Sequence, residues 1–380
     1  MNILFHYESL AIGGQQTQTL SILREIHQRG EDNLFFVYNY NDDLAGEFEK
    51  YCTLIKIPVY LKAKDYLKLW KLVLLIYKTA KYLKAYNIET IVSGSGLSSL
   101  ICGVAARLCG VKHYRIVGCS LVQVEKTLYR FYNIICIDKL IDGYFGWQEV
   151  FNQLKDKGVN VKKFIHTNGS VDTNIFYPLP QYEVMQLKKK YAVPENMLVI
   201  GWVGRTSYDM QVKYTIEMCR VLLEREFDKF HLLIVGGGSW FEQMVIKLEE
   251  YNLTSQATLT NWVAPSEVNG LLNCMDIVPL LEEDPQGGSI VREAMACGKI
   301  ALSVNGISGT QASFMKPDAT ILVDSESFIE NAANEIIKIY ESPENISTKG
   351  CKARSYAKKE LSFASQVDII LGTLKKEDHD

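Results

Sequence analysis

The sequence contains no CxxC motif, although it holds nine cysteines among its 380 residues. These cysteines are scattered and odd in number, which favours buried thiols in a reducing cytoplasm over disulfides or a zinc site. No uninterrupted apolar run reaches the about 18 residues that suggest a membrane-spanning helix. The nearest stretch, 91–111, is rich in glycine and serine and contains Arg107, so it predicts a strand, a turn and a buried helix. Met1–Phe5 reads as a strand, so we expect no signal peptide.

The composition is that of a globular chain with an uneven distribution of charge. Hydrophobic residues make up 47% and charged residues 22% of the sequence, and the length suits two domains of roughly 150–200 residues each. Residues 1–170 hold 21 Lys and Arg against 15 Asp and Glu, a balance of +6, whereas residues 171–380 hold 20 against 29, a balance of −9. The basic first part favours an anionic partner such as a membrane surface. No basic motif interleaved with aromatic residues is present, so we expect no nucleic-acid binding.

The most informative stretch is Glu282–Gly298, which reads EEDPQGGSIVREAMACG. Ser289 suits the N-cap of a short helix and Gly298 suits its C′ position, with apolar residues between them. The unpaired N–H groups and the partial positive charge of a helix N-terminus can hold a phosphate. The same features fit an ordinary capped helix of the core, so the stretch alone leaves both interpretations open.

A second stretch strengthens the phosphate interpretation. Leu198–Lys213 reads LVIGWVGRTSYDMQVK, an apolar strand followed by Gly204, Arg205 and, eight residues later, Lys213. Two cations after the end of a strand suit a diphosphate. Trp262 follows another expected strand, at the position where open α/β sheets bind nucleotides, and is a candidate for contact with a base.

Together these stretches resemble the retaining GT-B glycosyltransferases of family 4, the group 1 glycosyl transferases. Three further passages match the family in its order along the chain: MNILFHYESLAIGGQQTQTL at 1–20, HTNGSVDTNIFYP at 166–178 and HLLIVGGG at 231–238. The resemblance implies an α/β fold of the GT-B type, with two Rossmann-like, doubly wound domains facing across a cleft. It places an acceptor-side domain at 1–173, joined by a C-terminal helix at about 358–380, and a donor-binding domain at 174–357.

The resemblance also implies roles for individual residues. Arg205 and Lys213 would hold the nucleotide diphosphate of a sugar donor, and Glu293, one turn into its helix, would orient the donor through the ribose. The candidate donor-binding set comprises Gly13, Gly14, Gly204, Asp284, Gly288, Ser289, Ile290, Val291 and Trp262. No protein nucleophile, metal or cofactor is expected. The acceptor would be a glycan or a lipid-linked molecule of cell-surface polysaccharide or glycolipid synthesis.

One position departs from the family pattern. The family motif has two glutamates separated by seven residues, and counting back from Glu293 puts Pro285 at the first of them. One residue inserted in the glycine turn would make Asp284 the counterpart. Because the first acidic residue usually contacts the donor sugar in this family, the departure bears on donor identity and on activity. The first alternative is a catalytically silent GT-B-like scaffold or partner protein, and a less favoured one is a GT-B epimerase.

A nicotinamide dehydrogenase is the other enzyme that the glycines suggest. Three glycines, 236–238, follow an expected strand, but the third glycine of the dinucleotide pattern would fall on Phe241. No acidic residue follows a second strand at the expected distance. The sequence therefore disfavours this class.

The stretch Tyr66–Tyr86 predicts a helix with a basic face. On a helical projection, four lysines lie along one narrow side: Lys64, Lys68, Lys71 and Lys78. Tyrosines and Trp70 flank an apolar body, a composition that suits a helix at an anionic membrane surface. An ordinary surface helix with a solvated lysine face fits the pattern as well.

Elsewhere the sequence predicts a regular alternation of strands and helices, and hence a parallel sheet covered on both faces. In the second part the expected strands are 198–203, 231–235, 257–260, 277–280, 300–304 and 320–323. In the first part we expect Asp142–Trp147 to be the last strand. Lys352–Lys375 is expected to form one final helical segment.

Overall fold

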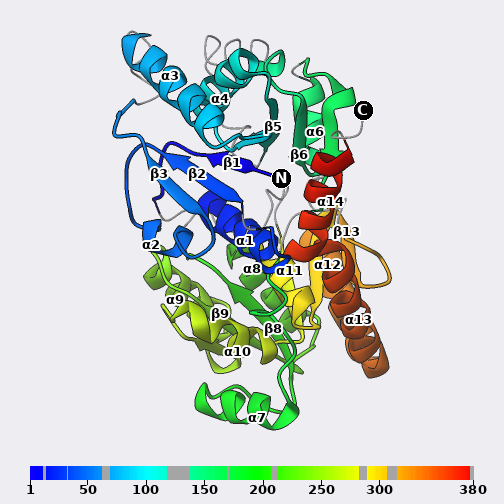
Figure 1. The fold of residues 1–380 in the computed structure, drawn as a ribbon. Coiled ribbons are helices and arrows are strands. Elements are labelled where there is room, and N and C mark those ends of the chain that lie inside the picture. The colour runs from blue at the N-terminus through cyan, green and yellow to red at the C-terminus, as the bar shows by residue number, and fades with distance from the viewer. Residues whose placement is uncertain are drawn as a thin grey trace. The chain divides into compact units, whose positions relative to one another are not determined.

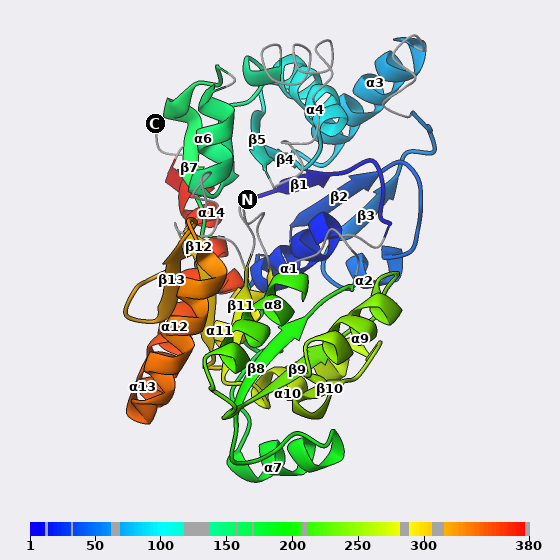
Figure 2. The ribbon, with the colours of Figure 1, turned by 180° about the vertical axis from the view of Figure 1, so that it is seen from behind.

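The chain divides into two compact units, each built around its own parallel sheet (Figure 1 and Figure 2). Unit 1 comprises Met1–Gly169 and Phe363–Asp380, and unit 2 comprises Ser170–Ser362. The computed structural model describes the chain apart from residues 12–13, 32, 62–68, 118–136, 157, 169–170, 207–211, 282–288, 306–314 and 377–380. Within the described residues, no helix is long and apolar enough to cross a bilayer.

The sheet of unit 1 has the order β3-β2-β1-β4-β5-β6-β7, and all of its paired strands are parallel. Its strands are β1 (Ile3–His6), β2 (Leu34–Tyr38), β3 (Thr53–Lys56), β4 (Thr90–Ser93), β5 (Lys112–Ile116), β6 (Gly143–Gly146) and β7 (Phe164–His166). Its helices are α1 (Gly14–Gln28), α2 (Ala45–Phe48), α3 (Leu69–Ala85), α4 (Gly96–Cys109), α6 (Gln148–Asp156) and α14 (Phe363–Lys376), with a 3₁₀ turn η3 (Val161–Lys163).

Helices cover both faces of this sheet, which explains why β1, β4 and β6 are buried at every residue rather than at alternate ones. Ile3 and Phe5 of β1 join a core with α1 and with Val367 and Ile370 of α14. Leu4 points to the opposite face, where the core is completed by α3 and α4. The C-terminal α14, red in Figure 1, therefore packs on the N-terminal α1, blue in the same view.

The sheet of unit 2 has the order β10-β9-β8-β11-β12-β13 and is also parallel. Its strands are β8 (Leu198–Val203), β9 (Phe230–Val235), β10 (Ala257–Leu259), β11 (Ile277–Leu280), β12 (Ile300–Asn305) and β13 (Thr320–Asp324). Its helices are α7 (Gln181–Lys190), α8 (Val212–Glu224), α9 (Phe241–Glu250), α10 (Val268–Asn273), α11 (Ser289–Ala296), α12 (Phe328–Tyr340) and α13 (Pro343–Tyr356). Two 3₁₀ turns, η4 (Thr254–Gln256) and η5 (Pro265–Glu267), and a π-helical segment, η6 (Ala357–Leu361), complete the unit. Each strand predicted here is confirmed to within one residue at either end.

Two expectations about the chain's path are wrong. Asp142–Trp147, expected to be the last strand of unit 1, contains β6. The last strand is instead β7, whose three residues pair with β6 at the edge of the sheet. The expected single helical segment 352–375 is broken at Ser362, which is extended and forms a bridge with Val171. The N–H of Val171 donates to the carbonyl of Leu361 at 2.8 Å. This long-range pairing, which no local pattern reveals, ends one helical run and lets α14 begin at Phe363.

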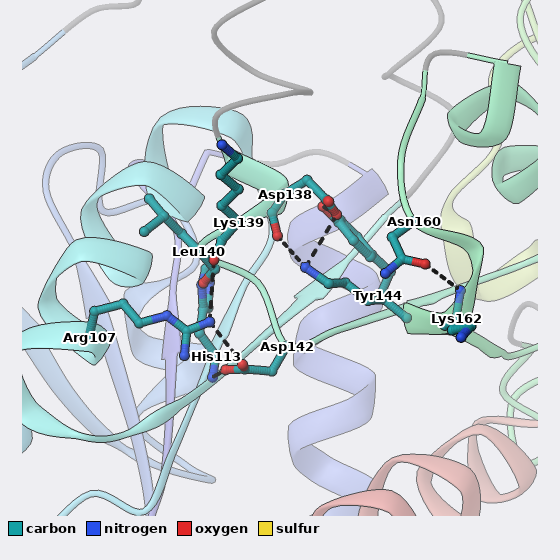
Figure 3. Close-up of polar contacts among 10 residues, drawn as sticks. Arg107, His113, Asp138, Lys139, Leu140, Asp142, Tyr144, Asn160 and Lys162 are labelled. Carbon is teal, nitrogen blue, oxygen red and sulfur yellow. Dashed lines mark hydrogen bonds and ion pairs between the residues drawn. The ribbon is translucent and has the colours of Figure 1, made fainter.

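Two fully buried histidines belong to the polar core of unit 1. The carbonyl of Leu140 can only accept, so Nδ1 of His113 donates to it at 2.8 Å, and Nε2 accepts from the hydroxyl of Ser93 at 2.8 Å. Asp142 binds both the backbone N–H of His113 and the guanidinium of Arg107, at 2.8 and 2.9 Å (Figure 3). Burial lowers the pKa of His113 to about 4, and burial together with the nearby His113 lowers the pKa of His6 to about 3. His113 is thus a neutral, fully enclosed structural residue.

These histidines predict that the fold loses stability in mild acid. Below pH 6.5 the unfolded chain takes up protons on both rings and the folded chain does not, so the free energy of unfolding falls as the pH drops from 6.5 towards 4. The slope is at most about 1.4 kcal/mol per pH unit for each histidine. Urea unfolding at several pH values measures it. His113→Gln should reduce the slope, whereas Gln at the exposed His166 should not; equal slopes in all three proteins would contradict the prediction.

Candidate functional site

The strand order of unit 2 fixes where a ligand is expected. From β8 the chain proceeds outwards through β9 and β10, and from the adjacent β11 it proceeds in the other direction through β12 and β13. In open parallel sheets, ligands bind beyond the carboxyl ends of the strands at such a reversal. The candidate site is therefore the edge beyond the ends of β8 and β11.

A glycine-rich junction forms the β8–β9 side of this edge. A Cβ atom on Gly236, whose φ is +125°, would lie 1.9 Å from the carbonyl oxygen of Gly204. A Cβ atom on Gly238 would lie 2.3 Å from the carbonyl oxygen of Thr206, and the N–H of Thr206 donates to Gly237 at 3.0 Å. The two loops thus pack backbone against backbone, which explains the run of three glycines after β9.

Trp262 stands beside this junction, just past the end of β10. Asn261 adopts a left-handed conformation with φ 58°, and its side-chain oxygen accepts from the N–H of Trp262 at 2.8 Å. A Cβ atom on Gly237 would lie 2.8 Å from the indole nitrogen, so the absent side chain leaves room for the ring. The tryptophan is 64% exposed and can offer an open aromatic surface to a ligand.

The two predicted cations lie on the segment that leaves β8. Arg205 follows Gly204 directly and is exposed. Lys213 is the second residue of α8, where its ammonium lies 4.8 Å from the centre of the Tyr214 ring. Both residues therefore belong to the connection that begins at the candidate edge.

Helix α11 follows β11 and has the ends that the sequence predicts, with a shift of one residue at its start. It begins at Ser289, which is its first helical residue rather than the residue before the helix. Gly298 has φ 73° and lies two residues past the end. Its N–H donates to Met295, and the N–H of Lys299 donates to Ala294, at 3.0 and 2.9 Å, which is the hydrogen-bond pattern of a Schellman cap.

Glu293 is a half-buried residue of α11. Burial raises the pKa of its carboxyl group, while a hydrogen bond from the Ser289 hydroxyl and the charge of Arg292 oppose that rise. Val291 and Arg292 are buried, whereas Ser289 is exposed and Ile290 partly so. The helix start is thus accessible, and Glu293 lies one turn behind it.

Several predicted residues lie outside the described part of the chain. They are Gly13, Asp284 and Gly288, together with Pro285, so the structure does not bear on the first acidic position of the motif. Gly14 is the first residue of α1 and lies in unit 1, whereas Arg205 and Glu293 lie in unit 2. In the described ranges, no group of three or more His, Cys, Asp or Glu side chains forms a metal site.

Sequence reasoning missed one acidic residue at the matching edge of unit 1. There the reversal lies between β1 and β4, and Glu8 follows β1. Its Oε1 atom accepts from the hydroxyl of Ser95 at 2.5 Å and from the N–H of Ser98 at 2.9 Å. Glu8 therefore shares the N–H of Ser98 with the N-cap residue Ser95 at the N-terminus of α4. An acidic residue two positions after the first strand was the available signal.

Two parallel, doubly wound sheets of this arrangement define the GT-B class of proteins. The fold is similar to that of Alr3699/HepE from Anabaena, crystallised with UDP (TM-score 0.83, 15% identity, 99% of this chain and 100% of that one). It is also similar to a glycosyltransferase from Rickettsia africae ESF-5 (0.82, 16%, 99% and 98%) and to the lipopolysaccharide outer core galactosyltransferase WaaB (0.73, 15%, 99% and 100%). No curated protein matches the sequence. Residues 184–359, most of unit 2, match the family Glycosyl transferases group 1.

The glycine junction predicts that Gly236→Ala will destabilise unit 2 by about 2–4 kcal/mol, since the substitution combines backbone strain with a clash against a carbonyl group. Gly298→Ala is the matched control, because that site also has a positive φ but its nearest neighbour would lie at 3.6 Å. It should cost about 1 kcal/mol. Thermal and urea unfolding measure both, and equal losses would show that crowding at Gly236 is unimportant.

The raised pKa of Glu293 predicts a pH dependence of stability opposite in direction to that of the buried histidines, and Glu293→Gln should remove it. A raised pKa means that the folded protein holds the proton more tightly, so stability falls as the pH rises from about 4.5 through the folded value. At pH 7 the neutral amide should therefore leave the ligand-free protein at least as stable as wild type, with a flatter pH dependence. Urea unfolding between pH 5 and 8 tests this, with Gln at the exposed Glu249 as control. A large loss of stability at pH 7 would contradict the prediction.

Proposed function

We propose that this glycosyltransferase moves a sugar from a nucleotide-diphosphate donor to a glycan or lipid-linked acceptor with retention of anomeric configuration. The observation that carries the proposal is the position of Arg205 and Glu293 on the connections that follow β8 and β11, on either side of the reversal in strand order. A diphosphate needs cations and free N–H groups, and a ribose needs an acceptor for its hydroxyls. Unit 2 would thus be the donor domain and unit 1 the acceptor domain.

The proposed donor is a UDP-sugar. HepE has been crystallised with UDP and with UDP-glucose, and its fold covers this chain almost completely. Trp262 would stack on the base, next to the Gly237 backbone. Arg205 and Lys213 would hold the diphosphate with the N–H groups at the start of α11, and Glu293 would accept from the ribose.

In the proposed reaction, the bond between the anomeric carbon and the diphosphate oxygen breaks and a bond from the acceptor oxygen forms on the same face of the sugar. The acceptor proton passes to the departing phosphate oxygen, so no protein nucleophile or metal is required. Arg205 and Lys213 stabilise the negative charge that builds up on the leaving group, which lowers the barrier most when the cations are already in position.

The proposed acceptor is a cell-surface glycan or glycolipid intermediate, reached from the cytoplasmic face of a membrane. WaaB, a lipopolysaccharide galactosyltransferase, shares the fold. The basic side of the α3 region would attract an anionic membrane. Of its lysines, Lys64 and Lys68 lie outside the described residues, and Lys71 donates to the carbonyl of Tyr60 at 2.9 Å.

The proposal predicts selective UDP binding by titration calorimetry, compared with GDP and ADP. Arg205→Ala and Lys213→Ala should each weaken UDP binding about tenfold or more, because each removes a charged contact worth about 1.5–3 kcal/mol. Glu293→Ala should weaken it as well. Lys247→Ala, which removes a cation from α9, is the matched control and should bind like wild type.

Product analysis completes the test. NMR of the glycoside formed from a UDP-sugar should show the anomeric configuration of the donor. Folded protein that binds none of the three nucleotides would support the silent-scaffold alternative. A product with inverted anomeric configuration would contradict the retaining mechanism but not the proposed donor site.

A further inference from the structure

The solvent-facing side of α3 is apolar over its first half. Leu69, Trp70, Val73 and Tyr77 are each 63–65% exposed, which is unusual for four large apolar residues on one helix. At about 100° per residue, Trp70 and Tyr77 lie about 20° apart around the helix axis, and Val73 lies about 60° from Trp70. The opposite side, with Leu75 and Leu83, is buried in the core that α3 shares with α4. In Figure 1 α3 lies at the margin of unit 1.

The charges on α3 have one sign. The helix carries four lysines and no acidic residue. Lys81 and Lys84 are exposed on the same side as Tyr77, about one to two turns further along. Lys71 is engaged with the Tyr60 carbonyl and lies on the flank, so the outermost face consists of an apolar half followed by a basic half.

This combination is complementary to the surface of an anionic bilayer. A tryptophan and a tyrosine prefer the headgroup level, aliphatic side chains prefer the acyl boundary, and lysines extend to lipid phosphates. Charge attraction alone brings a helix to such a surface but does not require exposed apolar residues. The exposed stripe supplies the part of the binding that salt does not screen.

We propose that α3 docks unit 1 on an anionic membrane by inserting its apolar half among the headgroups while Lys81 and Lys84 contact lipid phosphates. This docking deepens the membrane contact of the proposed function, on which it rests. It makes Leu69, Trp70, Val73 and Tyr77 the main contributors to binding, with the lysines selecting anionic lipid.

The test is flotation of the full chain with vesicles of phosphatidylcholine, with and without phosphatidylglycerol, at low and high salt. Wild type should bind the anionic vesicles. The variant W70S/V73S/Y77S should bind the anionic vesicles at least tenfold more weakly than wild type at both salt concentrations. Lys81→Glu with Lys84→Glu should lose binding mainly at low salt. Tyr182→Ser with Met185→Ser, which removes exposed apolar side chains from α7 in unit 2, is the matched control and should bind normally.

Three outcomes would overturn the proposal. The first is that the wild-type protein does not bind anionic vesicles. The second is that W70S/V73S/Y77S binds them as strongly as the wild-type protein does. The third is a dimer in sedimentation analysis that the triple variant abolishes, because a second copy would then be the occupant of this face. Thermal unfolding of the same preparations shows whether the variants are folded, and UDP calorimetry tests the donor site separately. Vesicle binding without UDP binding would reject the proposed donor site and leave the docking intact.

Discussion

The close approach of Gly236 to Gly204 is the constraint on which the ligand edge of unit 2 depends. A Cβ atom at Gly236 would lie 1.9 Å from the Gly204 carbonyl oxygen, so only glycine allows the loops after β8 and β9 to meet backbone to backbone. Arg205 is then left exposed directly beyond the junction, and Trp262 packs beside Gly237. The same glycines that look like a dinucleotide motif thus allow two loops to pack closely.

The parts of the fold that could be predicted from the sequence are those that depend on local signals. In unit 2 the buried strands are apolar runs between turn residues, and each was predicted to within one residue. The strands that were missed, β3 and β7, have four and three residues and carry exposed or half-exposed side chains, so they leave little hydrophobic pattern. The break at Ser362 depends on Val171, far away in the chain, and no window around Ser362 contains that information.

The candidate site divides in the same way. Gly298 predicts the end of α11 because a residue with a left-handed conformation is needed there. Arg205 could be identified because it closely follows an apolar strand. The hydrogen bond between Ser289 and Glu293 and the burial of Glu293 depend on packing and could not be predicted. For α3 the sequence identifies a basic side, but only the contact with α4 shows that Trp70 and Tyr77, rather than Lys71, face outwards.

The two units differ at the N-terminus of the helix that follows the reversal of strand order, which is α4 in unit 1 and α11 in unit 2. In unit 1 the carboxylate of Glu8 accepts from the N–H of Ser98 and so occupies the N-terminus of α4. A phosphate would meet both a filled position and a negative charge there. In unit 2, the first described residue of α11 is Ser289, an exposed serine whose hydroxyl forms a hydrogen bond with Glu293. This contrast supports the proposal that unit 2, rather than unit 1, holds the nucleotide diphosphate.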